Sequence, residues 1–450
     1  MTPLEAVFGN DPWWIVLIKV VAVFVLLLIW TIFNVWFERR VLGKMQNRKG
    51  PIMNGPLGLG QAMGDGVKLL FKEDFRPART DGLVYNLAPM LTAVAAFASW
   101  SVIPFGGEVR MFGVQTHLQI TDLPVGALLV MAIAGVGFYG FVLAGWSSNG
   151  TYSLLGSMRA TAQVISYEIA MGLSLVAVFM FAGSMSTSEI VTAQALPITL
   201  FGRIVPLSGW YALLLAPSFV VYFISMFGET NRQPFDMPEC ESELVSGHIT
   251  DYSGFRYALF FLAEYINMAT VSSVATTLFL GGYRLPWPLN QIEFLNNPWF
   301  GPLVFMIKVQ VLIFCFSWVR AAVPRVRYDQ MMDLGWKVLI PVNLVWITML
   351  AMIRGAYQHG WTGSPVFVVA AIVLLAILLA AIWFGGGEPE PDGGAVPGEQ
   401  HDFDPFAGGY PVPPMPGQVA IGTVPGRPAE GDREATTAPR RATATNGVDA

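Results

Sequence analysis

The residues in this sequence best suited to proton chemistry are carboxylates crowded into one short segment. Between residues 229 and 251 the sequence holds six acids and, inside those limits, one arginine, Arg232. The six acids are Glu229, Asp236, Glu239, Glu241, Glu243 and Asp251. Crowded carboxylates raise one another's pKa and share protons. The segment is therefore either a solvated acidic loop or a functional carboxylate cluster, and both interpretations stay open.

Helix capping explains part of this acidity. Asp236 at a helix N-cap, with Pro238 in the first turn and Glu239 three residues on, would complete a capping box. Both carboxylates would then face the positive end of the helix dipole. Glu241 and Glu243 are not explained in this way. If the segment is helical, Asp236, Glu239 and Glu243 lie along one face, where like charges repel.

A few charges interrupt long apolar stretches. Glu168 lies about 9 Å into one stretch, and Glu264 lies roughly 12 Å past Arg256 in another, at a helical rise of about 1.5 Å per residue. Lys308 is near the middle of a third. Each costs roughly 2.5–3.5 kcal/mol in a bilayer, so we expect each to face a polar cavity or a partner. For Lys308 the alternative is a structural ion pair with a carboxylate. Lys19, near the end of its stretch, is expected to snorkel.

Titratable groups that lead from an interface into the membrane are what a proton relay requires. No nucleotide-binding loop or nucleophile–base pair accompanies them. Two cysteines, Cys240 and Cys315, are too few for a disulfide framework or a four-thiolate metal site, and the four histidines show no ligand spacing. Any redox or energy input must therefore come from other chains.

These charges must be positioned by membrane-spanning helices. The chain has 450 residues, 54% hydrophobic and 13% charged, against roughly 25% charged in a soluble domain. A spanning helix needs about 20 apolar residues, and only helix satisfies its backbone in lipid. Nine stretches qualify: 13–37, 83–104, 123–145, 162–183, 209–228, 257–280, 299–319, 334–353 and 361–384. We expect an all-α polytopic membrane protein with about nine transmembrane helices.

The distribution of Lys and Arg predicts the orientation. Loops after the odd-numbered stretches hold sixteen, and loops after the even-numbered stretches hold four. Because basic loops stay in the cytoplasm, we expect the N-terminus outside and the C-terminus inside. The first stretch is not expected to be a cleaved signal peptide, since no basic residue precedes it and its apolar run is too long.

The first cytoplasmic loop contains a segment with helical periodicity. In the first cytoplasmic loop, apolar residues recur near helical spacing between charged ones, which predicts an interfacial amphipathic helix. The apolar residues are Leu59, Met63, Val67 and Leu70, and the charged ones are Asp65, Lys68 and Lys72. The helix is either a simple anchor or the border of a lipid-side opening.

The segment 385–450 has a different composition. It holds 11 Pro, 13 Gly and ten acids against four bases, which predicts a disordered cytoplasmic tail. The tail carries a charge of −6 and the rest of the chain +1.

Five strings carry a resemblance to a known family. They are ERRVLGKMQNRKGP (38–51), QAMGDGVKLLFKE (61–73), SMRATAQVISYEI (157–169), PFDMPECESELVSGHITDYSGFRYALFFLAEY (234–265) and RAAVPRVRYDQMMDLGWKVLIP (320–341). In this order they resemble the H-type membrane component of respiratory complex I, the NADH:quinone oxidoreductase, whose mitochondrial equivalent is NADH dehydrogenase subunit 1.

The resemblance implies a membrane subunit at the junction with a redox-active peripheral arm. Family members form much of the quinone-access tunnel and begin the acidic channel that couples quinone reduction to proton pumping. The family core has eight spans and some bacterial members have nine, which is compatible with the nine stretches found here.

Site residues follow from the matching strings. Those near the quinone entry or chamber are Glu38, Arg39, Asp65, Glu73, Arg320, Arg325 and Arg327. Tyr328 and Asp329 continue the last of these strings, where contacts to the chamber or arm are expected. With Lys308 added, the expected proton-coupling set is Glu168, Glu229, Asp236, Glu239, Glu241, Glu243, Glu264 and Lys308.

The resemblance also implies the substrate and partners. Quinone is the expected substrate, with no cofactor bound covalently and no metal. Iron–sulfur clusters and flavin are expected in partner subunits. The partners would be peripheral-arm redox subunits on the cytoplasmic side, small membrane subunits, antiporter-like subunits and lipid, but no nucleic acid. The expected location is the plasma membrane of a bacterium.

Two departures and two other interpretations remain. The family's GPN-x-VGP string reads GPIMNGP at 50–56, and Cys240 stands where Gly is usual. A membrane-bound hydrogenase or other ferredoxin-linked complex has a similar membrane component. The quinone-side motif between Glu38 and Glu73 is fully retained here, which favours complex I. An autonomous ion transporter is disfavoured, because no inverted repeat is evident and the large charged loops resemble docking surfaces.

Overall fold

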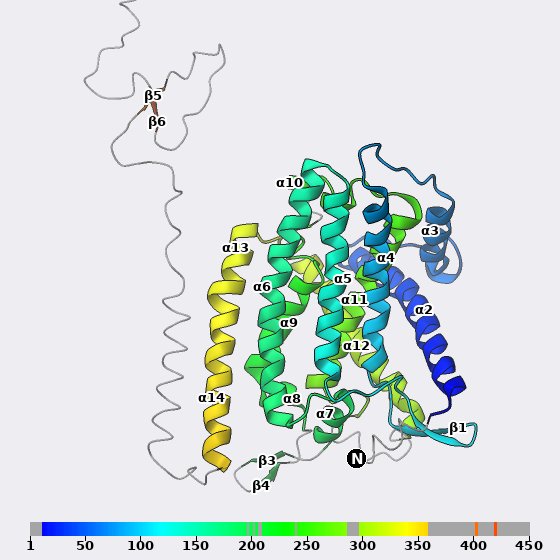
Figure 1. The fold of residues 1–450 in the computed structure, drawn as a ribbon, viewed down its shortest axis with the longest axis vertical. Coiled ribbons are helices and arrows are strands. Elements are labelled where there is room, and N and C mark those ends of the chain that lie inside the picture. The colour runs from blue at the N-terminus through cyan, green and yellow to red at the C-terminus, as the bar shows by residue number, and fades with distance from the viewer. Residues whose placement is uncertain are drawn as a thin grey trace, which may run out of the picture. The chain divides into compact units, whose positions relative to one another are not determined.

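Long apolar helices dominate the computed structural model of the chain (Figure 1). The structure describes residues 11–195, 198–200, 203–205, 209–238, 241–285, 297–358, 401–403 and 418–420. By its contacts the chain divides into two units, Met1–Gly385 and Gly386–Ala450.

The first unit is built mainly from helices. They are α2 (Trp13–Met45), α3 (Gly60–Phe71), α4 (Gly82–Ala98), α5 (Gly126–Ser147), α6 (Thr151–Ala182), α7 (Thr187–Ala193), α8 (Tyr211–Leu214), α9 (Ala216–Glu229), α10 (Glu241–Leu244), α11 (Gly254–Phe279), α12 (Gly301–Ala322), α13 (Tyr328–Asp333) and α14 (Ile340–Gln358). Short 3₁₀ turns are η1 (Pro56–Gly58), η2 (Ser99–Val102), η3 (Gly247–Ile249) and η5 (Pro298–Phe300), and η6 (Leu334–Leu339) is a π-helical segment.

Strands are few and short. β1 (Glu108–Met111) pairs antiparallel with β2 (Val114–His117), and β3 (Ile198–Leu200) pairs antiparallel with β4 (Arg203–Val205). The fold class predicted from composition, an all-α polytopic membrane protein, is confirmed.

Seven helices in the described part of the chain are long and apolar enough to cross a membrane. They are Trp13–Met45, Gly82–Val102, Gly126–Ser147, Thr151–Ala182, Gly254–Phe279, Pro298–Ala322 and Tyr328–Gly355. They correspond to seven of the nine predicted spans, namely all but the fifth and the ninth. The ninth, 361–384, lies outside the described residues.

The fifth predicted span, 209–228, is not one continuous helix. It is divided into α8 and α9 at Leu215, whose φ of −109° and ψ of 43° are not helical. Pro217 lies in the first turn of α9. A proline has no N–H to donate to the preceding turn, and its ring clashes with the backbone there, so the helix breaks before it.

Two helices extend beyond the predicted apolar limits. α2 continues through Glu38 to Met45, and α6 begins at Thr151 instead of 162. The charged string that starts at Glu38 is therefore helical at its beginning. The predicted amphipathic helix is present as α3, and none of its residues is buried in the chain.

α11 lies at the centre of the bundle, against α2, α4, α9 and α12 (Figure 1). Its buried face carries small residues such as Ala269, Ser272 and Ser273, which let neighbouring helices approach closely. The Ser272 hydroxyl donates to the Met268 carbonyl oxygen at 2.8 Å, so burial leaves this polar group satisfied. A central helix fixed in this way can hold side chains on several faces in defined positions.

The second unit contains two three-residue strands, β5 (His401–Phe403) and β6 (Gln418–Ala420), which pair in parallel. The predicted disordered tail, 385–450, includes these six residues and stays a prediction. The prediction for the other residues of 385–450 falls on positions that the structure does not describe.

Candidate functional site

A buried carboxylate, Glu38, forms the centre of a charge network near the end of α2. Its residue is 4% exposed, and its Oε1 accepts a short hydrogen bond from Nη1 of Arg320 on α12. Nη1 of Arg232 lies 3.7 Å from the same oxygen. The Tyr265 hydroxyl of α11 donates to Oε2 at 2.6 Å. Three elements far apart in sequence therefore converge on one carboxylate.

Arg232 links Glu38 to a second acid. Its Nε lies 3.0 Å from Oε1 of Glu264, one residue before Tyr265 on α11. Its guanidinium also lies over the Tyr265 ring, 4.4 Å from the centroid. The network thus holds two carboxylates and two guanidinium groups, and its formal charge is zero. Such pairing is required, because a buried charge without a partner is strongly destabilising.

The neutral network is sensitive to protonation. If Glu38 or Glu264 took up a proton, an arginine would lose its counter-charge in a poorly solvated site. The remaining groups would then rearrange or exchange charge with the surroundings.

The other intramembrane acids form a separate group. Glu168 on α6 and Glu229 at the end of α9 are close enough to interact electrostatically. The Glu168 carboxyl faces α5, since a Cβ built on Gly135 would lie 3.3 Å from its Oε1. Glu229 Oε2 is buried and accepts no hydrogen bond from the described residues. The two acids predicted inside spans therefore lie in different groups, Glu264 with Glu38 and Glu168 with Glu229.

The acidic segment was predicted to contain a capping box formed by Asp236 and Glu239, and the described residues cover only part of it. The short helix α10 begins at Glu241, five residues after Asp236, so Asp236 is not its N-cap. Glu239 lies outside the described residues, and of Glu241 only the backbone is described. Asp236 interacts electrostatically with Glu264, which connects the segment to the buried network. Asp236 lies before α10 and Glu243 lies within it, so one helix does not carry both residues in the described structure.

Contacts with α6 hold this segment in place. Gln163 Nε2 donates to the carbonyl oxygens of Gly228 and Phe235, each at 2.7 Å. Arg159 forms a short ion pair with the exposed Glu243. Gly247 has a φ of +51°, and a Cβ there would lie 1.7 Å from the Pro238 carbonyl oxygen, so only glycine fits. The segment is therefore anchored at both ends.

The string after α12 covers the acidic segment. Arg325 Nη2 donates a hydrogen bond to the Asp236 carbonyl oxygen. The Arg159 guanidinium lies over the Tyr328 ring, 5.5 Å from its centroid. Arg327 and Asp329 are exposed and 4.0 Å apart. Arg320 and Arg325 thus belong to the site, whereas Arg327 faces outward.

An apolar groove of about 660 Å³ lies between α2, α3, α4 and α11. Its lining includes Phe24, Leu28, Ile32, Val35, Leu69, Val94, Phe97, Phe255 and Leu262. Two charged residues, Arg39 and Asp65, also line it, with Arg39 Nη1 2.7 Å from Asp65 Oδ2. Partial burial would raise the pKa of Asp65, but the Arg39 guanidinium outweighs it and the pKa is lowered. Asp65 is therefore ionised near neutral pH.

The groove and the buried network adjoin at consecutive residues of α2. Glu38 points into the bundle toward Arg320, whereas Arg39 points to α3 across the groove. Glu73 is exposed and does not line the groove. Its neighbour Asp74 pairs with Arg256 at 2.8 Å. Of the four residues that the resemblance selected in this region, Glu38 lies in the network and Arg39 and Asp65 line the groove. Glu73 lies apart from both.

Lys308 contacts the backbone that follows α11. Its Nζ donates to the carbonyl oxygens of Leu280, Gly282 and Arg284, at 2.7, 2.9 and 2.5 Å. It also lies 4.7 Å from the Trp210 ring centroid. Among the described residues it has no carboxylate partner, and the ion-pair alternative stays untested. It caps the C-terminal end of α11, roughly 22 Å along the helix from Glu264.

Three polar residues of these networks were missed by sequence reasoning. Arg232 and Tyr265 join Glu38 to Glu264, and the one arginine within an acidic segment was the available signal. Lys19 was expected to snorkel, but it is 7% exposed. Its Nζ lies 2.6 Å from both Asp11 Oδ2 and Thr116 Oγ1. A carboxylate just outside the first apolar stretch was the signal for this pair.

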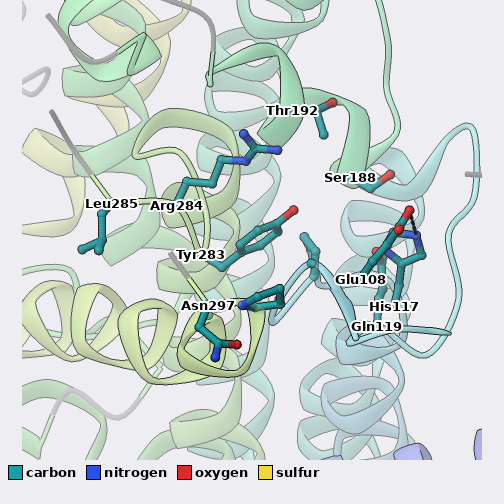
Figure 2. A pocket seen from close by; sticks show the side chains of 14 residues that line it. Glu108, His117, Gln119, Ser188, Thr192, Tyr283, Arg284, Leu285 and Asn297 are labelled. Carbon is teal, nitrogen blue, oxygen red and sulfur yellow. Dashed lines mark ion pairs between the residues drawn. The ribbon is translucent and has the colours of Figure 1, made fainter. Parts of the chain in front are cut away.

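A second cavity, of about 730 Å³, has a lining of mixed polarity and contains none of the predicted site residues. Figure 2 shows Tyr283 and Arg284 on one side of it, opposite Glu108, His117 and Gln119. His117 Nε2 lies 3.4 Å from Glu108 Oε1. Burial lowers the pKa of His117, although Glu108 opposes this. The cavity is separate from the groove and the carboxylate network.

Comparisons with known proteins agree with the family suggested by the five strings. A family model described as NADH dehydrogenase matches residues 18–351. A protein of Cutibacterium acnes named as the H subunit of NADH-quinone oxidoreductase is 59% identical over 444 residues, 98% of this chain and 98% of that protein. A protein of Streptomyces avermitilis with the same name is 48% identical over 444 residues, 96% of this chain and 95% of that protein.

Proposed function

The chain belongs to the NADH dehydrogenase family as an H-type membrane component of the NADH-quinone oxidoreductase complex, and we propose that its apolar groove admits quinone sideways from the bilayer. The protein is thus a multi-pass membrane subunit of an enzyme complex. The relatives' names favour this complex over the hydrogenase and transporter alternatives.

The groove has the properties that a quinone tail needs. Its lining is almost entirely apolar, and a long isoprenoid chain gains free energy by leaving water for such a surface. Its walls are the spanning helices α2, α4 and α11 and the amphipathic helix α3. We propose that the tail lies between these elements while the headgroup moves past Arg39 and Asp65.

One observation carries the proposal: Arg39 in the groove is followed inward by Glu38 of the buried network. A headgroup that passes Arg39 reaches the side of the bundle where Arg320 and Glu38 meet. We propose that the headgroup site there is completed by peripheral-arm subunits on the cytoplasmic side, whose iron–sulfur clusters supply electrons from a flavin.

Reduction consumes electrons and protons and therefore changes the charge beside the network. We propose that Glu38, Arg232 and Glu264 respond first, since they are paired and poorly solvated. The change would pass through Asp236 and Glu241 to Glu229 and Glu168. From there it would reach small membrane subunits and antiporter-like subunits that move protons. Lys308, which caps α11, contributes by positioning that helix.

The orientation belongs to the same proposal. Placing the basic loops in the cytoplasm puts the Glu38 network, Arg325 and the acidic segment on the side where the peripheral arm would dock. The N-terminus would be outside, and the membrane would be the plasma membrane of a bacterium.

The test is to obstruct the groove without altering its charges. Leu28→Trp adds bulk to the groove wall on α2, and Val21→Trp makes the same change on a lipid-exposed position of that helix. A quinone tail that passes the added ring must force it aside, and crowding of this kind costs about 1–3 kcal/mol. If this cost is added to the barrier for quinone entry, Leu28→Trp should slow reduction of long-tailed quinone roughly 5- to 150-fold. Val21→Trp should remain close to wild type.

Rates would be measured in membranes with assembled complex, using a long-tailed quinone, a short water-soluble quinone and a soluble electron acceptor. The soluble acceptor reports whether the peripheral arm is intact. Normal turnover of long-tailed quinone by Leu28→Trp would exclude the groove as the entry route.

A further inference from the structure

The β1–β2 hairpin has an exposed aromatic residue at its tip. Phe112 and Gly113 connect the strands with φ values of +50° and +88°, as in the two-residue turns that match the twist of a hairpin. Such positions favour Gly, Asn or Asp, because a side chain is strained at positive φ. Phe112 is nevertheless 78% exposed. Turn geometry does not explain a large apolar ring there.

The two faces of the hairpin differ in polarity. Register pairs Val109 with Thr116 and Met111 with Val114, so these four residues share one face. Arg110 pairs with Gln115 and Glu108 with His117 on the opposite face. Val109 and Thr116 are buried, whereas Arg110 and Gln115 are exposed. The hairpin is therefore amphipathic, with one apolar and one charged surface.

Two contacts fix the hairpin beside the first turns of α2. The Phe112 ring meets the Trp14 ring edge to face, with 6.0 Å between centroids. The Thr116 hydroxyl belongs to the buried network of Lys19 and Asp11, with Lys19 Nζ 2.6 Å from Thr116 Oγ1. Trp14 and Lys19 are about 7.5 Å apart along the helix. Figure 1 shows β1 across this end of the bundle, next to the start of α2.

These contacts set the depth of the hairpin relative to the membrane. α2 is a membrane-spanning helix, and its first turns expose Trp13 at 78% and Leu17 at 55%. Aromatic side chains concentrate where a spanning helix leaves the hydrocarbon. A hairpin that contacts Trp14 and Lys19 therefore lies within the headgroup layer and not in the water beyond it.

The space under the hairpin is apolar as well. A cavity of about 220 Å³ separates it from α2, lined by Ile18, Ala22 and Leu26 on the helix and by Met111 and Leu118 on the hairpin side. Apolar surface on both sides of this space continues the exposed surface of α2. It suits acyl chains better than water.

We infer that the β1–β2 hairpin is a membrane anchor whose partner is the phospholipid of the leaflet at the N-terminal end of α2. The Phe112 ring at the tip enters the acyl region beside Trp13, whereas the apolar face of the hairpin packs toward α2 and the Arg110 face meets water. The Lys19–Thr116 contact transmits this anchoring to α2, one wall of the groove. The anchor goes beyond the proposed function and does not depend on quinone entry.

The experiment places a photoreactive benzoylphenylalanine at position 112 of the full-length chain in the assembled, membrane-bound complex. After illumination, the chain is isolated and the peptide containing residue 112 is weighed. We expect a shift by the mass of one phospholipid. A cross-link to another protein subunit, or no lipid adduct, would overturn the inference.

The same probe at two other positions serves as a negative and a positive control. The same probe at Gln115, on the charged face of the hairpin, should give no lipid adduct, and equal labelling at 112 and 115 would contradict the predicted orientation. The probe at Trp13 should give the lipid adduct and shows that the chemistry works. Quinone reduction by the probe-bearing complex shows that the complex is assembled. We expect assembly to tolerate the probe, because Phe112 is exposed.

Discussion

At the scale of single residues, partners decide what a charge in this chain does. Glu38 and Lys19 both lie in α2 and both are buried, yet Glu38 meets two arginines beside the groove and Lys19 fastens a hairpin. Lys308 is also inside a spanning helix but caps the end of another. The cost of placing a charge in the bilayer draws attention to Lys308, but that cost does not distinguish a coupling group from a structural one.

Glu168 gives a prediction for coupling. Glu168→Gln keeps the shape of the side chain but removes its proton-carrying group. Because proton-transfer groups contribute on the order of 100-fold to a rate, we expect proton-gradient formation and coupled quinone reduction to fall by about tenfold or more. Both would be measured in membrane vesicles, with Glu168→Asp as the titratable control. Wild-type activity and gradient in Glu168→Gln would remove this residue from the pathway.

His248 gives a prediction for pH dependence. It is 2% exposed, packs edge-on against Phe141 and Phe260, and neither ring nitrogen has a hydrogen-bond partner in the described structure. Burial lowers its pKa to about 3, from an ordinary value of 6.5. The unfolded chain therefore binds a proton below pH 6.5 that the folded chain does not bind until about pH 3.

Stability contributed by neutral His248 is complete above pH 6.5 and decreases as the pH falls. At pH 5.5 the loss should be on the order of 1 kcal/mol. We expect His248→Phe, which keeps an aromatic ring, to lose less thermal stability than wild type between pH 7.5 and 5.5. The measurement is the half-life of the complex at raised temperature. Identical pH dependence in both proteins would contradict the assignment.

At the scale of elements, irregular helices position the site as much as regular ones. The break between α8 and α9 separates the two parts of the fifth span, and α9 carries Glu229 at its end. The π-helical segment η6 follows α13 and packs against α6. The Tyr167 hydroxyl of α6 donates to the carbonyl oxygen of Met331 in the adjoining helix α13 at 3.2 Å. These irregular segments thus lie next to or within the helices that carry Glu168 and Glu229.

Gly335 tests the contact between η6 and α6. A Cβ there would lie 2.1 Å from Ser166 Oγ, while the next atoms, Ser166 Cβ and Tyr167 Cε2, are 3.4 and 3.8 Å away. Gly335→Ala should therefore destabilise the packing by about 1–3 kcal/mol. Adding Ser166→Ala should restore most of this loss, because it removes the clashing atom.

The measurement is the amount and thermal stability of assembled complex. Gly172→Ala on α6 is the control, since a Cβ there meets nothing within 4 Å. No rescue by Ser166→Ala would mean that the backbone of η6, and not this side chain, requires the glycine.

At the scale of the whole molecule, charge is unevenly divided. The overall −5 combines a membrane part of +1 with a segment 385–450 of −6. The family model ends at residue 351, whereas the Cutibacterium acnes relative matches 98% of the chain. The last segment is thus outside the family model although related proteins carry a counterpart.

Removing residues 385–450 should leave the complex assembled and active, because the groove and both carboxylate groups lie in the first unit. Native gels and NADH-driven quinone reduction would be compared with the full-length chain. Loss of the complex on the gel would show that this segment contacts a partner.

The sequence alone determined the membrane class, most of the spans, the amphipathic helix and the family. These properties reside in local runs and strings, since apolar length and helical spacing can be read along the chain. It also identified most of the acids and arginines that the site contains. It did not identify Arg232, Tyr265 or Lys19 as members of networks.

Only the tertiary structure decided which charges meet. Glu38 is 282 residues from Arg320 and 227 from Tyr265, and no spacing rule connects them. Their pairing depends on how helices rotate and pack around α11. The same packing separated Lys308 from the acids and placed the groove against Glu38. Side-chain chemistry was fixed by the sequence, but the electrostatic environment of each side chain arises from helices that are distant in the chain and adjacent in space.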